Sequence, residues 1–279
     1  MFSDANSSNQ DVSVVILTRN SARTIQLCLA SVIGEGPREV VVVDALSTDD
    51  TLRIIGRYGV RLIVARLNSL GYSRKLGVEA AKGTFVMFVD SDVVLSKGCI
   101  LAMKRELLEN GWVGIHASLV SSGYVSYWQR AEDQAMGRRQ QLGPRTRIGT
   151  AAALFYRSVL VRYPFDVMLK ESSEDRDLSF RIVKDGYILG VSRASAYHLR
   201  RSDFPAFALR LFRYGLGDAA FSKKHGIVHE RFLERMRTMA HYTAHSNIRQ
   251  TVELVPYWIV TGAIQLFGFL VGLSKPREP

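Results

Sequence analysis

The stretch Thr84–Ser96 reads TFVMFVDSDVVLS, and it decides the fold that we expect for this chain. Phe85–Val89 is apolar and follows a lysine–glycine turn, so it predicts a buried strand. Asp90 and Asp92 follow where the apolar run ends. Because residues i and i+2 of an extended chain face the same way, both carboxylates can converge on one divalent cation. Short Asp-x-Asp sequences also occur by chance in turns, so the motif needs support from its neighbours.

Apolar runs alternate with helix signals on the N-terminal side of this stretch. Further strands are expected at Val12–Thr18, Val40–Val43 and Arg61–Ala65. Helices are expected from Ser21 to about Ile33, from the Ser47–Asp50 cap to Tyr58, and over Gly71–Ala81. This alternation predicts an α/β fold with a doubly wound, mostly parallel sheet.

Polar residues fall at the carboxyl ends of three of these strands, where ligands bind in doubly wound sheets. They are Thr18, Asp44, Asp90 and Asp92. Each could be a cap or a turn former, but four at equivalent places indicate a ligand site.

Four successive segments resemble the motifs of the family 2 glycosyltransferases, which have the GT-A fold. They are VSVVILTRN, VVVDALSTDDT, YSRKLGVEAAKG and FVDSD, and the resemblance runs from about Val12 to Arg201. It implies a nucleotide-diphosphate sugar as donor and Mg²⁺ or Mn²⁺ as cofactor. It also implies that Asp44 contacts the nucleotide base, that Asp90 lies near the ribose and the metal, and that Asp92 holds the metal on the diphosphate.

The helix before the Asp-x-Asp strand carries further residues that match this pattern. Arg74 stands where the family has its usual arginine. Two positions depart from the family. Ala45 replaces a second aspartate after Asp44, and Lys75 replaces an asparagine. Lys75 still carries a positive charge suited to a diphosphate, so we expect it, with Thr18, to bind the donor.

A second acidic cluster, ESSEDRDLSFR, spans Glu171–Arg181 and predicts the start of a helix. Acids at a helix start commonly serve only as partners of the helix dipole. The cluster also resembles the family's Glu-Asp motif, which implies that one acid is the catalytic base. We favour Asp175, with Glu174 as the alternative, and expect Asp177 to cap the helix or to pair with Arg181 four residues later.

His198 follows a short predicted strand at Tyr187–Val191 and a loop. A lone histidine is often structural. At this interval after the Glu-Asp motif, the resemblance implies a histidine that completes the metal site. The adjacent Arg200 and Arg201 could face the diphosphate.

The resemblance implies that the segment between the two motifs supplies acceptor subsites, but the segment does not identify the acceptor. We expect a helix over Lys97–Asn110, a strand over Trp112–Leu119, a helix over Tyr124–Gln141 and a strand over Gly149–Tyr156.

The C-terminal third is basic and then apolar. The chain has a formal net charge of +11, and the segment 199–250 holds ten lysines and arginines against four acids. The helix expected over Asp203–Phe221 is amphipathic. Leu254–Leu273 has twenty residues without a charge, about the ~20 needed to cross a bilayer. Tyr257 and Trp258 stand near one end of it, as interfacial aromatics do.

This pattern favours a membrane partner over nucleic acid, for which no binding motif accompanies the charge. Pro256, Gln265 and the glycines keep a re-entrant or interfacial segment open as the alternative to a span. The polar N-terminal residues 1–10 do not resemble a signal peptide. Cys28 and Cys99 are expected to be core residues in a reducing compartment, although a disulfide between them stays open.

The sequence therefore predicts an inverting, membrane-associated glycosyltransferase that acts on a glycan or lipid-linked acceptor. We expect a GT-A catalytic domain over 11–201 on the cytoplasmic side, a basic helical region over 202–250, and a hydrophobic membrane segment with its tail over 251–279. Alternatives are a polyprenyl-phosphate glycosyltransferase that needs no base, and a catalytically silent adaptor. A sugar nucleotidyltransferase is disfavoured, because the turn Thr18–Ser21 lacks glycine.

Overall fold

A computed structural model describes residues 8–67, 69–121, 126–136, 142–199, 203–227, 239–240 and 247–275. The chain forms two compact units. Unit 1 holds the sheet and the helices that flank it. Unit 2 holds the helices α5, α8 and α10 together with the short segment Glu171–Ser173.

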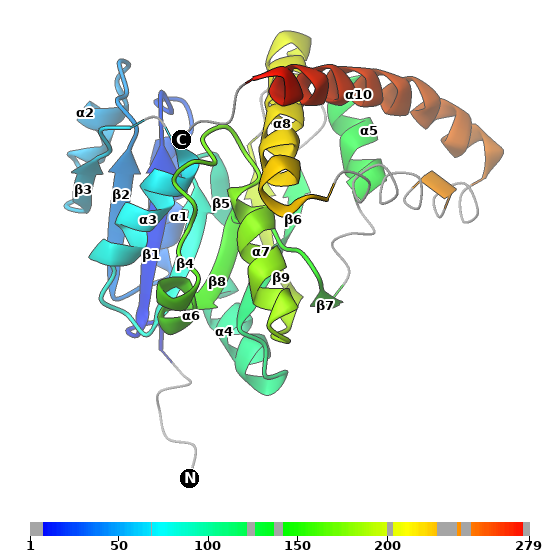
Figure 1. The fold of residues 1–279 in the computed structure, drawn as a ribbon. Helices are drawn as coiled ribbons and strands as arrows, with labels where there is room; N and C mark the ends of the chain where they lie inside the picture. Colours follow the sequence, from blue (N-terminus) through cyan, green and yellow to red (C-terminus); the bar gives the residue numbers. More distant parts are fainter. Residues whose placement is uncertain are drawn as a thin grey trace. The chain divides into compact units, whose positions relative to one another are not determined.

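Unit 1 is built on one mixed sheet whose strand order is β3-β2-β1-β4-β8-β6-β9-β5, with β7 paired to β9 (Figure 1). The strands are β1 Val12–Thr18, β2 Glu39–Asp44, β3 Arg61–Val64, β4 Phe85–Asp90, β5 Val93–Leu95, β6 Gly114–Ser121, β7 Gly143–Arg145, β8 Ala152–Tyr156 and β9 Leu189–His198. The first four are mutually parallel, whereas β8 is antiparallel to both β4 and β6. This confirms the predicted α/β fold with its mostly parallel sheet.

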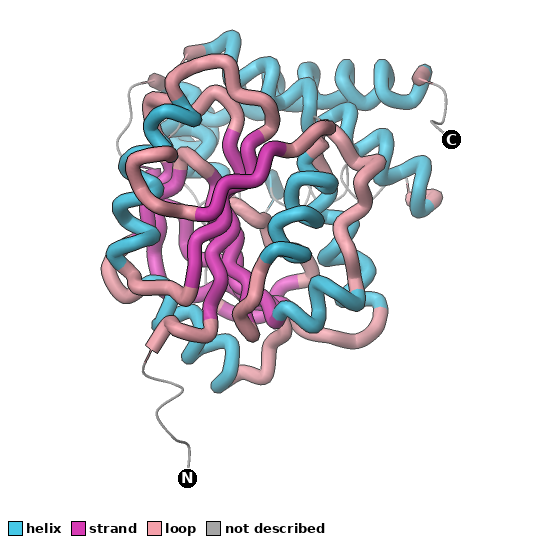
Figure 2. Tube along the Cα trace, turned by 90° about the vertical axis from the view of Figure 1, so that its left-hand side faces the viewer, coloured by secondary structure: helices cyan, strands magenta, loops and turns pink. Residues whose placement is uncertain are grey.

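Helices cover both faces of this sheet (Figure 2). They are α1 Ile25–Gly34, α2 Thr51–Ile55, α3 Leu70–Ala80, α4 Cys99–Glu109, α6 Arg157–Arg162 and α7 Glu174–Lys184. One apolar core lies between the sheet and α1, α2 and α4, and the other lies between the sheet and α3, α6 and α7. The alternating residues of β1 divide between the two cores, because successive side chains of a strand face opposite ways.

Several predicted boundaries differ from the structure. Ser21 does not cap a helix, because its carbonyl closes a turn with the N–H groups of Thr24 and Ile25, and α1 begins only at Ile25. The helix expected to reach Tyr58 ends at Ile55. The strand expected to end at Val191 continues to His198, because β6 and β5 pair with its second half. Cys28 and Cys99 are both free and buried.

Unit 2 contains α5 Tyr127–Met136, α8 Phe204–His225 and α10 Ile248–Ser274. Asp203 caps α8 by accepting a hydrogen bond from the Ala206 N–H at 2.8 Å. A small aromatic core joins the three helices, and it includes Phe207, Tyr257 and Trp258. Tyr257 and Trp258 are each only 8% exposed. They pack inside this unit, and their expected place at a membrane interface stays a prediction.

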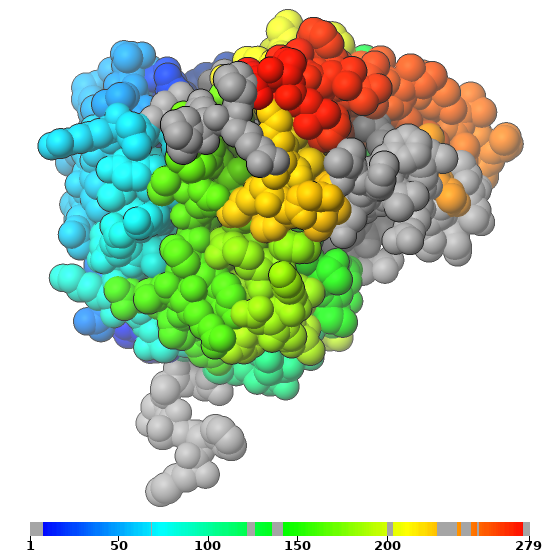
Figure 3. Space-filling model, in the orientation of Figure 1, coloured from blue at the N-terminus to red at the C-terminus, as the bar shows by residue number. Residues whose placement is uncertain are grey.

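Within α10, Thr251–Ser274 is long and apolar enough to cross a membrane by length and composition. Figure 3 shows α10 in orange to red.

Candidate functional site

Three of the predicted site residues lie at one edge of the sheet, at the carboxyl ends of adjacent parallel strands. Thr18 of β1 pairs with Asp44 of β2, and Leu17 of β1 pairs with Asp90 of β4. Asp44 is fully buried and accepts hydrogen bonds from the Ser47 N–H and the Ser47 hydroxyl. Asp44 thereby fixes the loop that follows β2.

That loop is also tied to the loop after β1. The Asn20 side-chain oxygen accepts from the Thr48 N–H at 2.8 Å, and the Asn20 N–H donates to the Ser47 hydroxyl. Asn20 and Leu46 both adopt the left-handed backbone region. Asparagine tolerates this region better than leucine does, so the tight turn after Asp44 is strained at Leu46.

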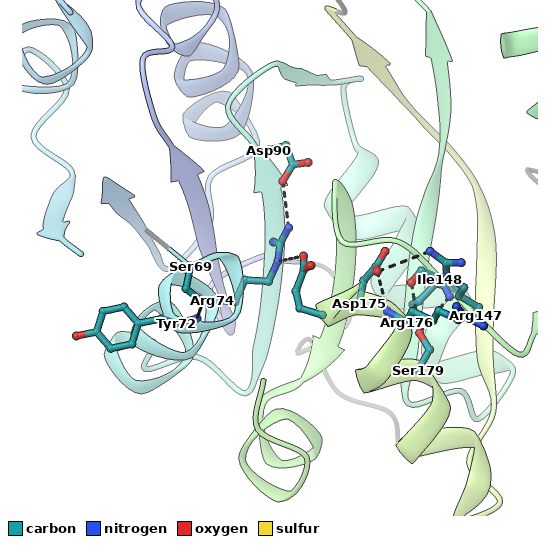
Figure 4. A network of polar contacts seen from close by, with 10 residues as sticks. Ser69, Tyr72, Arg74, Asp90, Arg147, Ile148, Asp175, Arg176 and Ser179 are labelled. Carbon is teal, nitrogen blue, oxygen red and sulfur yellow. Dashed lines mark hydrogen bonds and ion pairs between the residues drawn. The ribbon is translucent and has the colours of Figure 1, made fainter. Parts of the chain in front are cut away.

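Arg74 is the central cation of the site (Figure 4). It projects from α3 and is 3% exposed. Its Nε donates to Glu174 Oε1 at 3.1 Å, and its Nη2 lies 3.5 Å from Asp90 Oδ1. Its guanidinium also lies over the rings of Phe88 and Phe165, at 5.3 and 6.0 Å from their centroids. One side chain therefore links the end of β4 to the start of α7.

The charges in this cluster are strongly coupled. Burial disfavours the charged guanidinium, but the carboxylates of Glu174 and Asp90 outweigh it and raise the pKa of Arg74. Burial raises the pKa of Glu174 above its ordinary value, against the opposing charge of Arg74. Arg74 Nη1 is buried and finds no hydrogen-bond partner among the described residues, and the same holds for Thr18 Oγ1.

Asp92 and His198 come together on the antiparallel pair β5 and β9. His198 pairs with Val93 in the ladder, and its Nε2 lies 3.2 Å from Asp92 Oδ2. The Leu199 N–H also donates to the Asp92 carbonyl at 2.7 Å. Asp90, the third predicted metal ligand, points at Arg74 instead.

No group of three potential ligands converges on one point in the part of the chain that the structure describes. Asp92 could hold a hard cation, because Mg²⁺ is commonly bound by one or two carboxylates and completes its shell with water and substrate phosphates, and His198 would add a nitrogen ligand. The side chain of Asp92 is 41% exposed, which leaves room for such ligands.

Asp175 lies in the first turn of α7, as predicted, next to Glu174. Its Oδ1 accepts a hydrogen bond from the Arg176 N–H at 2.6 Å and lies 3.8 Å from an Arg147 nitrogen. Its other oxygen, Oδ2, faces Gly149, where a β-carbon would lie 3.8 Å from it. Asp177 pairs with Arg181 at 2.8 Å, which confirms that expectation and leaves Asp177 out of the site.

The sequence did not single out His116 or Arg147, and it marked Gly149 only as the start of a small, apolar strand suited to lie close to a substrate. A β-carbon at Gly149 would lie 3.6 Å from His116 Nε2, so the imidazole and the Asp175 carboxylate approach the same glycine. A register shift between β6 and β9 falls between His116 and Ser118, and such bulges re-aim side chains beside active sites. Burial lowers the pKa of His116 from 6.5 to about 4, so the imidazole is neutral at pH 7. Nothing in the local sequence marks their approach to one another, because pairing between distant strands brings them together.

The structure does not add the remaining predicted donor-binding residues to this cluster. Lys75 lies on the exposed side of α3, with its Nζ 3.9 Å from Glu79. Arg200 and Arg201 lie outside the described residues. Their predicted roles at the diphosphate stay predictions.

Several proteins of known activity are similar to this chain. TarS of Staphylococcus aureus strain Mu50, a poly(ribitol-phosphate) beta-N-acetylglucosaminyltransferase, is 39% identical over 95 residues, which cover 30% of this chain. Chondroitin synthase of Pasteurella multocida strain Pm70 is 32% identical over 111 residues, or 37% of this chain and 12% of the synthase. The chain matches only 17% of the length of the staphylococcal relative.

Solved structures show the same fold over nearly the whole chain. A crystal structure of S. aureus TarS 1–349 covers 94% of this chain and 90% of its own, with a TM-score of 0.52 at 20% identity. A complex of the same fragment with UDP-GlcNAc has the same coverage, a TM-score of 0.54 and 18% identity. These similarities confirm the predicted GT-A fold. The family model described as glycosyl transferase family 2 matches residues 13–167, which hold Asp44, Arg74, Asp90 and Asp92, and the chain therefore belongs to that family.

Proposed function

We propose that the chain is an inverting glycosyltransferase that moves a sugar from a nucleotide-diphosphate donor to an acceptor hydroxyl. Asp175 acts as the general base in this proposal, and Mg²⁺ or Mn²⁺ binds the diphosphate. Family membership supports the reaction class. The UDP-GlcNAc complex of the structurally similar S. aureus TarS supports a nucleotide sugar as the donor.

The observation that carries the proposal is that two of the four unsatisfied buried side-chain atoms among the described residues belong to Thr18, at the end of β1, and to Arg74, which contacts Asp90 at the end of β4. Arg74 Nη1 and Thr18 Oγ1 are buried and have no partner among the described residues. Leaving a buried polar group unpaired costs about 1–3 kcal/mol, so such atoms are rare unless a ligand satisfies them. A diphosphate sugar offers acceptor oxygens to both, and Asp44 and Lys75 are proposed to complete the donor site. Arg201 is proposed to join them.

The chemistry follows from the position of Asp175. Its Oδ1 is held by the Arg176 N–H, which leaves Oδ2 facing Gly149. An acceptor hydroxyl there would give its proton to Oδ2 as its oxygen attacks the anomeric carbon. The bond from that carbon to the diphosphate breaks on the opposite face, and the electron pair leaves with the diphosphate. The sugar is transferred with inversion.

A metal ion, held by Asp92 and His198 with Asp90 within reach, would neutralise the charge that develops on the leaving diphosphate. Arg74 supports the same side of the site, because its guanidinium contacts Asp90 and keeps one nitrogen unpaired. Glu174 is paired with Arg74, so we assign it a positioning role and keep Asp175 as the base.

We propose a hydroxyl acceptor because a base is present in the first turn of α7. Relatives that act on poly(ribitol-phosphate) support a glycan or polyol acceptor, and a lipid-linked glycan fits the same chemistry. A polyprenyl phosphate would need no base, because its attacking oxygen is already ionised. We also propose that the apolar segment within 251–279 associates with a membrane, that the basic helical region over 202–250 faces it, and that the GT-A domain, 11–201, acts on the cytoplasmic side.

The deciding experiment is Asp175→Asn, which keeps the size of the side chain and removes its basicity. A positioned base contributes about 10²–10⁴-fold, so we expect kcat to fall by that factor while the donor still binds. Donor binding is measured by thermal shift across a panel of nucleotide sugars with Mn²⁺, where a hundredfold excess over Kd adds about 2.7 kcal/mol of stability.

The outcomes separate the alternatives. A variant that transfers sugar within a few-fold of the wild-type rate would contradict the base and indicate an ionised acceptor such as a lipid phosphate. If the wild-type protein hydrolyses no nucleotide sugar and none of them raises its unfolding temperature, the chain is a catalytically silent adaptor.

A further inference from the structure

The outer face of α10 is a continuous apolar stripe. Its residues follow one another at steps of three, four or seven along the helix, which keeps them on one helical face. The stripe consists of Ile248, Val252, Val255, Ile259, Leu266, Leu270 and Leu273, which are 39–79% exposed. Monomeric proteins rarely leave so long an apolar surface uncovered without a partner.

The opposite face of α10 is already occupied by α8. Ring centroids of Phe207 and Tyr257 lie 6.3 Å apart near the start of the contact. Gly215 and Gly268 allow the closest approach, since a β-carbon at either would lie 2.2–2.3 Å from the carbonyl oxygen of a residue on the other helix. Lys223 then donates to the carbonyl oxygens of Gly272 and Lys275 near the end of both helices. Because the contacting residue numbers rise together, the two helices run in the same direction.

Because the two helices run side by side, each residue of α8 would lie at the same depth in a membrane as the part of α10 beside it. Arg210 and Arg213 lie between Phe207 and Gly215, so they stand level with α10 between Tyr257 and Gly268. That stretch is the middle of the apolar segment Thr251–Ser274. A spanning α10 would therefore carry two arginines to the interior of the bilayer.

The acids that pair with these arginines would be carried in with them. Arg210 binds Glu132 of α5 at 2.7 Å, and Arg213 lies 3.5 Å from Glu171. Ionised side chains at the centre of a bilayer are costly and rare. If α10 instead lies along the membrane surface, only the stripe enters the membrane. The charges of Arg210, Arg213, Glu132 and Glu171 then stay on the face of α10 that is opposite the stripe.

Charge at the two ends of the stripe identifies the kind of surface. Arg249 is 88% exposed, with its Nε 3.4 Å from Oε1 of the half-exposed Glu253, and Lys275 follows the last turn of the helix. The stripe itself contains no charged residue. Interfacial helices bind anionic bilayers by this combination of buried apolar area and flanking basic residues.

We infer that α10 lies in the plane of an anionic lipid bilayer, with the stripe inserted at the boundary between headgroups and acyl chains. This inference rests on the proposed membrane association, replaces a span with a monotopic contact, and places Arg210 and Arg213 on the side of α10 that faces away from the lipid, in place of a basic region that faces it. Ile259 and Leu266 form the centre of the contact, and Ile248 and Leu273 form its ends.

A depth profile tests the orientation of α10 directly. The native cysteines are free but buried, so single cysteines introduced at Val252, Ile259, Leu266 and Leu273 can be spin-labelled selectively in the full chain. On vesicles with phosphatidylglycerol and phosphatidylcholine at about three to seven, we expect all four labels at one shallow depth, about 5–10 Å into the boundary. A profile that is deepest at Ile259 and Leu266 and emerges on opposite sides would establish a span and overturn the inference.

A charge-substitution pair tests the surface itself. The double variant Ile259→Lys and Leu266→Lys should bind these vesicles at least about tenfold less tightly, because two apolar side chains are lost from the contact. The matched control is Leu62→Lys with Val161→Lys, two exposed apolar residues of unit 1, and it should bind as the wild type does. Binding that is unchanged in the stripe variant, or labels that contact no lipid, would assign the stripe to another partner, such as a second copy of the chain.

Nucleotide-sugar thermal shifts on the same variants keep the two proposals apart. The stripe variant should retain the donor-induced shift of the wild type while it loses the vesicles. If the wild type binds vesicles but shows no shift with any nucleotide sugar, the proposed reaction fails and the membrane contact stands.

Discussion

The two compact units differ in the groups that their own packing leaves without contacts. In unit 1 the apolar residues are enclosed between sheet and helices, and Thr18 and Arg74 keep buried polar atoms that have no partner among the described residues, as one atom of Arg210 does in unit 2. In unit 2 the helices enclose a small aromatic core, and one helix keeps a long apolar stripe exposed. Unit 1 therefore calls for a polar ligand, and unit 2 calls for an apolar environment.

The largest expected effect tests the polar side of this comparison. Asp92→Ala should abolish metal-dependent transfer and leave the fold intact, because Asp92 lies at a strand end with a side chain that is 41% exposed. Activity and thermal unfolding are measured with and without EDTA. Asp50→Ala, an exposed carboxylate paired with Arg53, is the control and should behave as the wild type. Near-normal activity of Asp92→Ala in EDTA would remove the metal from the mechanism.

Arg74→Met should unfold unit 1 far more readily than any change at its surface. The substitution leaves the buried carboxylate of Glu174 without its cation, and breaking such a pair costs about 3–5 kcal/mol. Urea unfolding measures the loss. The double variant Arg74→Met with Glu174→Gln removes both charges and should recover part of it. A single variant as stable as the wild type would show that this pair does not hold the site together.

His116 should make the stability of unit 1 depend on pH. Its pKa falls from 6.5 to about 4 in the folded chain, so between these values the unfolded chain binds a proton that the folded chain does not. This contribution is complete above about pH 6.5 and is lost as the pH falls through the interval, by at most about 3 kcal/mol at ~1.36 kcal/mol per pKa unit. The difference between wild-type and His116→Asn unfolding curves should show that slope. Parallel curves would place the imidazole in solvent.

The smallest effect tests the close packing of unit 2. Gly268→Ala should destabilise this unit by about 1–3 kcal/mol, because the added methyl group would lie 2.3 Å from the Phe212 carbonyl oxygen. Gly34→Ala is the matched control, since a β-carbon there meets nothing within 4 Å, and it should be neutral or stabilise the chain by up to about 1 kcal/mol. Equal effects of the two substitutions on the free energy of unfolding would contradict the tight contact between α8 and α10.

Local pattern was enough to predict the parallel half of the sheet. Val12–Thr18 and Phe85–Val89 are apolar runs with polar residues at their ends, so both the strands and the ligand edge could be read from the sequence. The antiparallel half was not predictable in the same way. His198 was expected after a loop, but it lies at the end of a long strand because β5 and β6 extend the pairing.

Long-range pairing also explains the contacts that were missed. His116 and Gly149 lie far apart in the chain and meet Asp175 only after β6, β8 and α7 have packed. In unit 2, Tyr257 and Trp258 had the composition of interfacial anchors, but α5 and α8 supply an aromatic core that buries them. Periodicity reports which face of an element is apolar, and it cannot report what covers that face.

The position of Arg74 has a consequence for how the chain is made. Its partner Glu174 lies a hundred residues later in the sequence, so the ribosome completes strands β1 to β4 long before the second carboxylate exists. Until then Asp90 is the only one of its two carboxylate partners that has been synthesised, so the cost of burying the guanidinium is offset by one negative charge instead of two. A fragment that stops at residue 167, where the family match ends, should therefore stay loosely packed around α3, and synthesis of α7 should be the step that locks it.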